Sequence, residues 1–216
     1  MARQGVRPTL DSYNYLITQL GIDVVMCIDG GVDGIFRGDE HDLGTPSMDS
    51  ISIIATSLCK ASLKIYSCTA FGTEGAESRV SHAQALNRMS DLTQQGAMLG
   101  VGLILKNSSA GGGFVDAANF IFDRLPPLHR STIVSTILAA MEGHYGRTTV
   151  NEKTRERQPW ISPLTALVWY FDANMVAQMK LFYEQAKESS TVEEVASAIE
   201  VVRQQINIKP FEAIPL

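Results

Sequence analysis

Short apolar runs rich in β-forming residues alternate along this chain with segments whose apolar residues recur every three or four positions. The run at 22–28 (IDVVMCI) is closed by Asp29 and two glycines. Its near-continuous apolarity is typical of a parallel strand covered on both faces. Strands are expected at 22–28, 63–71, 97–105 and 164–171. Helices are expected at 10–20, 47–61, 79–95, 114–124, 129–141, 173–187 and 191–205.

This alternation predicts the fold class. Strands separated by helices favour parallel pairing through right-handed crossovers, so we expect a Rossmann-like three-layer α/β sandwich with a mostly parallel sheet flanked by helices. No internal repeat or long linker divides the sequence, so residues 1–216 are expected to form a single domain. Four strands are few for such a sheet. Either an edge strand is unrecognised, or another chain or segment completes the sheet, and we therefore expect a homo-oligomer or a partner chain.

Charge and hydropathy exclude several classes of partner. The chain carries 18 basic against 23 acidic residues, a net charge of −5, which disfavours binding to nucleic acid or to an anionic membrane. The longest apolar run, 97–105, is about half the length of a membrane-spanning helix. The N-terminus lacks a signal core, and the three cysteines show no CxxC spacing. We therefore expect a cytoplasmic protein that binds neither nucleic acid nor membrane.

The loop after the first expected strand, DGGVDGIFRGDEHDLGTP, concentrates acidic residues and glycines. Ligands of open parallel sheets bind at the carboxyl ends of the strands, where this loop begins. A divalent cation, Mg²⁺ or Mn²⁺ rather than Ca²⁺, would relieve the repulsion between its carboxylates. We expect Asp29 and Asp33 to bind the metal, with Asp39 or Glu40 in support. The expected ligand-binding residues of this loop are Gly30, Gly31 and Arg37. The alternative is a solvated loop whose aspartates and glycines only form turns.

Two further loops carry candidates for catalysis. Glu74, or its neighbour Glu77, follows the second expected strand and is the candidate general base, although Glu77 also suits the first turn of a helix. His144 and Arg147 lie in a loop between glycines and could bind developing negative charge. A histidine in a loop is also commonly a surface residue.

Two more positions are candidates for ligand binding. The loop 108–113 precedes an expected helix, so the N–H groups of Gly111 and Gly112 could hold an anion, although such loops are also plain connectors. Asp172 ends the last expected strand and would share the edge of Asp29 in a parallel sheet, although it could also cap the helix that follows.

Three segments resemble the uncharacterised family catalogued as domain of unknown function 1152. They are IDGGVDGIFRGDEHDLGTPSMDSISIIA, FGTEGAESRVSHAQAL and VWYFDANMVA, and together they extend the resemblance over most of the chain. The resemblance implies residues 29–44 as a site but no established activity. It also implies that family members are longer, with an N-terminal glycine-rich half that this chain lacks, so that the chain would be the C-terminal part of a longer architecture.

These observations lead to two functional hypotheses. The first is an enzyme that uses a divalent cation, held by the acidic loop, for hydrolysis or group transfer on a small phosphorylated or nucleotide-like molecule. The second is a non-catalytic module that binds a small ligand, or a subunit of an oligomeric assembly.

Overall fold

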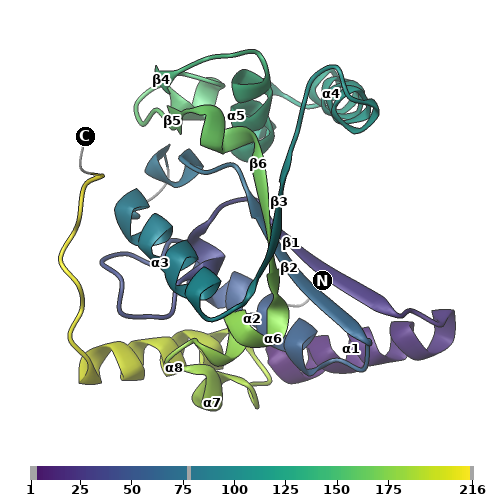
Figure 1. Cartoon of the computed structure of the whole chain (residues 1–216), viewed down its shortest axis with the longest axis vertical. Coiled ribbons are helices and arrows are strands. Elements are labelled where there is room, and N and C mark those ends of the chain that lie inside the picture. The colour runs from purple at the N-terminus through teal and green to yellow at the C-terminus, as the bar shows by residue number, and fades with distance from the viewer. Residues whose placement is uncertain (1–3, 77–78, 215–216) are drawn as a thin grey trace.

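The computed structural model describes residues 4–76 and 79–214, which contain a central four-stranded sheet (Figure 1). Its strands are β1 (Val24–Asp29), β2 (Leu63–Thr69), β3 (Met98–Leu103) and β6 (Leu167–Asp172), in the order β1-β2-β6-β3. β1 and β2 are parallel, whereas β6 is antiparallel to both of its neighbours. The predicted α/β class is confirmed, but the sheet is mixed rather than mostly parallel.

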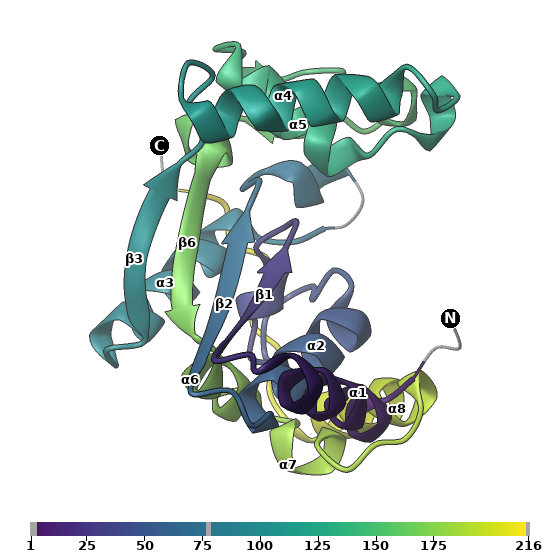
Figure 2. The same cartoon turned by 90° about the vertical axis from the view of Figure 1, so that its right-hand side faces the viewer.

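The direction of β6 follows from the path of the chain between β3 and β6. Residues 104–166 form a lobe beyond the carboxyl ends of β1, β2 and β3 (Figures 1 and 2). The elements of this lobe are α4 (Ser109–Phe122), α5 (Thr132–Met141), β4 (Gly146–Arg147) and β5 (Trp160–Ile161). The chain re-enters the sheet beside the end of β3, where the Ile104 N–H donates to the carbonyl oxygen of Ala166 at 3.0 Å. β6 therefore starts at the edge where the other strands end and runs against them.

One face of the sheet is covered by helices. The helices outside the lobe are α1 (Val6–Leu20), α2 (Pro46–Leu58), α3 (His82–Gln94), α6 (Ala173–Gln178), α7 (Tyr183–Ala186) and α8 (Val192–Gln205). Pro46 opens α2 at a position where its missing N–H costs nothing, and the side-chain oxygens of Ser81 and Thr191 cap α3 and α8. The helix expected at 173–187 is instead two short helices, α6 and α7. Across the described residues, every helix is too short or too polar to cross a membrane.

The hydrophobic core lies between the sheet and these helices. α2 contributes Ile53 and Ile54, which are fully buried, because its apolar positions face the strands. From the sheet, Tyr66 and Phe171 point toward the core and stack with their ring centroids 6.3 Å apart. This packing fixes the carboxyl ends of β1 and β2, on which the site below is built.

The opposite face of the sheet is not covered by the helices that the structure describes (Figure 2), and the exposed side chains on it are apolar along β1. Val24, Met26 and Ile28 are exposed at every second position of β1, and Ile28 is 71% exposed. Leu63 on β2 pairs with Val24 and continues this face. The expectation that the first strand is covered on both faces is wrong, because the helices of the described residues cover only one.

Candidate functional site

Three carboxylates converge at the carboxyl end of β1. Asp29 is the last residue of the strand, Asp33 follows after a turn through two glycines, and Asp49 lies in the first turn of α2. Each offers an oxygen within 4.8 Å of the oxygens of the other two. The loop is built for this approach at Gly44, whose φ is +64° and where any β-carbon would collide with the Asp33 carboxylate.

Hydrogen bonds hold the three carboxylates in place. The Tyr66 hydroxyl donates to Asp29 Oδ2 at 2.7 Å. The Thr45 backbone N–H donates to Asp33 Oδ2 at 2.9 Å, and the Thr45 hydroxyl donates to Asp49 Oδ2 at 3.0 Å. One residue of the loop thus links two of the carboxylates, while the sheet supplies the donor for the third.

A fourth carboxylate, Glu74, lines the same cavity. Glu74 Oε1 accepts the Val32 N–H at 2.5 Å, and Oε2 accepts the Gly72 N–H at 3.1 Å. His82 at the start of α3 places its Nε2 3.4 Å from Glu74 Oε2. The cavity has a volume of about 250 Å³ and is lined on the lobe side by Ile133 of α5. It has room for an ion with several waters or a small anionic group.

Burial and mutual repulsion favour the protonated carboxyls. Burial, together with the charges of Asp49 and Asp33, raises the pKa of Asp29 to about 8. Burial and the charge of Asp49 raise the pKa of Asp33 to about 7. Burial also raises the pKa of Asp49. A bound cation would reverse this balance, because it favours the charged form of every carboxylate around it.

Buried cationic side chains hold the acidic loop against the core. The Lys180 side chain is buried, and its ammonium donates to the carbonyl oxygens of Gly34 and Phe36, at 2.9 and 3.0 Å. Burial lowers the pKa of Lys180 to about 8. Arg203 of α8 donates to the carbonyl oxygens of Gly38 and Glu40. The loop is therefore anchored at both halves, unlike a loop whose charges are only solvated.

The structure brings together part of the metal site expected from sequence. Asp29 and Asp33 lie in the cluster, and Gly30, Gly31 and Glu74 line its cavity. The supporting acids lie elsewhere in the loop. Glu40 accepts the backbone N–H groups of Arg37 and Gly38, and Asp39 pairs with Arg37 and Lys209. The Glu77 alternative falls outside the described residues.

The remaining candidates are placed away from the cluster. His144 and Arg147 of the lobe line other cavities, and His144 Nε2 lies 3.9 Å from Glu142. The Gly111 N–H donates to the Ser108 hydroxyl oxygen, and the Gly112 N–H donates to the Ser108 carbonyl oxygen. Both N–H groups expected to bind an anion are therefore already hydrogen-bonded within the chain.

Asp172 lies at the opposite edge of the sheet, since β6 is antiparallel and pairs Asp172 with Ile65. Its carboxylate caps α6 by accepting the N–H groups of Asn174 and Met175, as its alternative interpretation proposed. The expectation that it shares the edge of Asp29 is wrong because it assumed a parallel last strand.

Sequence reasoning missed Asp49 and Tyr66. The signal for Asp49 was present, because Thr45 and Pro46 mark a helix start, and the first turn of a helix after a parallel strand faces the carboxyl ends of the strands. The signal for Tyr66 was weaker. A tyrosine in the middle of an apolar strand shows only that its hydroxyl needs a partner.

These features define an α/β protein with a carboxylate-lined cavity at the carboxyl ends of two parallel strands. Residues 2–206 match the family model described as "Protein of unknown function (DUF1152)", and the chain belongs to that family. The resemblance noted in the sequence is thereby confirmed. No curated protein and no solved structure matches the chain.

Proposed function

We propose that this protein binds a divalent cation through Asp29, Asp33 and Asp49 and uses it in hydrolysis or group transfer on a small phosphorylated or nucleotide-like molecule. The observation that carries the proposal is the approach of three carboxylates, one buried and two half-buried, with oxygens within 4.8 Å of one another, in one cavity. Hard divalent cations prefer such oxygen ligands. Mg²⁺ or Mn²⁺ suits the site better than Ca²⁺, since the cavity leaves room for the waters and phosphoryl oxygens that Mg²⁺ retains.

The proposed chemistry follows from the cation and from Glu74. A cation held in this cavity would polarise a phosphoryl group or lower the pKa of a water molecule bound to it. Glu74 lines the same cavity, is held by two backbone N–H groups, and would act as the general base. Arg147 and His144, expected from sequence to bind developing charge, line other cavities and have no part in this step.

The test is calorimetric titration of chelator-treated protein with Mg²⁺, Mn²⁺ and Ca²⁺. Replacing Asp33→Asn or Asp49→Asn removes one charged ligand, and each variant is expected to bind Mn²⁺ at least about tenfold more weakly. The matched control is Asp116→Asn on the exposed side of α4, which should bind like the wild type. Equal Mn²⁺ affinity in the wild type and both site variants would refute the cation site.

The open sheet face favours a second candidate function, that of a subunit in a homo-oligomer. Val24, Met26 and Ile28 of β1 form an exposed apolar row on a flat surface, and such rows on soluble proteins commonly mark interfaces. A two-fold related copy would cover this face with the same residues. We expect a concentration-dependent dimer in sedimentation velocity, which Met26→Asp weakens and Val201→Asp, on the exposed side of α8, does not. A monomer at every micromolar concentration would exclude this candidate.

A further inference from the structure

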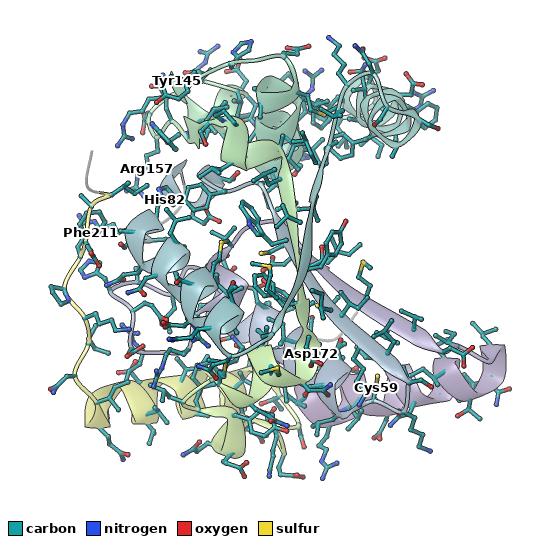
Figure 3. All side chains as sticks on the ribbon, in the orientation of Figure 1. Cys59, His82, Tyr145, Arg157, Asp172 and Phe211 are labelled. Atoms are coloured by element: carbon teal, nitrogen blue, oxygen red, sulfur yellow. The ribbon has the colours of Figure 1, made fainter. Side chains whose placement is uncertain are left out.

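A second and larger cavity lies between the start of α3, the β4–β5 pair and the C-terminal tail. Its volume is about 610 Å³, within the range of small-molecule sites. Figure 3 shows His82 at the start of α3 and Phe211 on the tail, on the same side of the molecule. The lining residues that matter for binding are His41, Arg79, His82, Arg147, Trp160 and Phe211.

Two guanidinium groups make this cavity suited to an anion. Arg79 precedes α3, and Arg147 belongs to β4, so they reach the cavity from different parts of the fold. Both side chains are exposed at the cavity, and within residues 4–76 and 79–214 neither guanidinium group is in a hydrogen bond or an ion pair. Glu212 is the only carboxylate among the lining residues of the described chain, which leaves an excess of positive charge. A guanidinium group can donate two parallel hydrogen bonds to two oxygens of one phosphate group.

Aromatic side chains supply a surface for a flat ring. Trp160 is half-buried and lines the cavity, with the ring of Tyr145 5.9 Å behind it. Phe211 lines the cavity from the tail and is steadied by an edge contact with His41 at 5.7 Å. A planar ligand in contact with such faces gains burial and stacking.

The tail is held in place as a wall of this cavity. The Lys209 N–H donates to the carbonyl oxygen of Asp39 at 2.8 Å. Gln84 Nε2 and Ser81 Oγ donate to the carbonyl oxygens of Pro210 and Glu212, at 2.9 and 2.6 Å. These bonds fix the extended backbone on both sides of Phe211. The wall therefore comes from residues beyond 206, where the match to the family model ends.

We propose that this cavity binds a small molecule that combines a planar aromatic ring with a phosphate group, as in a nucleoside monophosphate. Arg79 and Arg147 hold the phosphate, and the ring lies against Trp160 and Phe211. The inference does not depend on the cation site, because these four residues line a different cavity from the acidic cluster.

The test is calorimetric titration of the full chain in EDTA with adenosine monophosphate and phenyl phosphate, and with adenosine and inorganic phosphate as the separate halves. The two combined molecules are expected to bind, and each half at least about tenfold more weakly, since each forfeits one set of contacts. Arg79→Gln and Arg147→Gln should each weaken binding about tenfold, as should Phe211→Ala or truncation after residue 206. Arg124→Gln, on the surface after α4, is the matched control and should bind like the wild type.

The outcomes separate cleanly. Binding of the combined molecules that both arginine substitutions weaken supports the proposal, and preference between the two molecules identifies the ring as a nucleobase or a simpler aromatic group. Absence of binding by both, or binding that neither arginine variant changes, overturns it. Because EDTA removes divalent cations, either result is independent of the carboxylate cluster.

Discussion

The carboxylates of Asp29 and Asp33 are costly to ionise where the fold places them. Their raised pKa values, about 8 and about 7, mean that the folded chain holds protons that the unfolded chain has already released at neutral pH. The cost arises from packing three acids at the end of β1 beside a fully buried Tyr66. A bound cation would offset this cost, because it favours the ionised form of all three carboxyls.

The pH dependence of stability follows from these two residues. Folding raises the pKa of each carboxyl from near 4 in the unfolded chain. The protein therefore loses stability as the pH rises from that value to the pKa in the folded chain. In EDTA, the free energy of unfolding should therefore fall between about pH 4 and pH 8 and then level. Asp33→Asn removes one such group and should be more stable than the wild type at pH 8.5, by on the order of 1–3 kcal/mol. Urea unfolding at several pH values checks this. The prediction is contradicted if the free energy of unfolding depends on pH equally in the variant and the wild type.

The Tyr66 hydroxyl makes the Asp29 charge less costly, because its hydrogen bond lowers the pKa of that carboxyl. Tyr66→Phe should raise the pKa of Asp29 further and weaken Mn²⁺ binding several-fold at pH 7. The loss should be smaller at pH 9, where a larger fraction of Asp29 is ionised in both proteins than at pH 7. Calorimetry at pH 7 and pH 9 measures this, with Tyr170→Phe on β6 as the control. A loss of the same size at both pH values would point to a packing defect instead.

At the scale of elements, the site depends on where turns begin and end. Gly44 places Thr45 so that its N–H reaches Asp33, and this requires a left-handed backbone beside a carboxylate. Such a position admits only glycine without strain. The loop geometry, and not the number of acids in it, decides which carboxylates converge.

A matched pair of glycine substitutions tests this dependence. Gly44→Ala introduces a β-carbon into the Asp33 carboxylate and should cost at least about 1–2 kcal/mol of stability. Gly112→Ala lies within α4 with open space around it and should stabilise the protein by about 0.5–1 kcal/mol. Thermal unfolding of both variants provides the measurement. A neutral Gly44→Ala would show that the loop adjusts freely.

Most of the elements could be predicted from the sequence, but the direction of β6 could not. The strands and most helices follow from local periodicity, and the acids of β1 follow from the rule that parallel strands present their carboxyl ends to ligands. The direction of β6 could not be predicted, because it depends on a lobe whose packing is non-local. That single reversal moves Asp172 to the opposite edge. Asp39 and Glu40 are acids of the same loop as Asp29 and Asp33. The turns of the loop direct them to other partners, backbone N–H groups for Glu40 and Lys209 for Asp39.

At the scale of the whole molecule, one face of the sheet is packed and the other is open (Figure 2). Both cavities border the lobe formed by residues 104–166. Ile133 of α5 lines the acidic cavity, while Arg147 and Trp160 line the larger one. β1, the loops after β1 and β2, and the start of α2 contribute the acids, and the lobe contributes lining residues to each cavity.

β3 and β6 pair with each other where the chain enters and leaves this lobe. Leu103 pairs with Leu167, so the two strands are already joined as the arms of a β-hairpin, and the lobe occupies the place of its turn. A segment attached in this way can be lengthened, shortened or exchanged without altering the hydrogen bonding of either arm. A change within the lobe can therefore alter Ile133 in one cavity, or Arg147 and Trp160 in the other, while the pairing of β3 with β6 is kept.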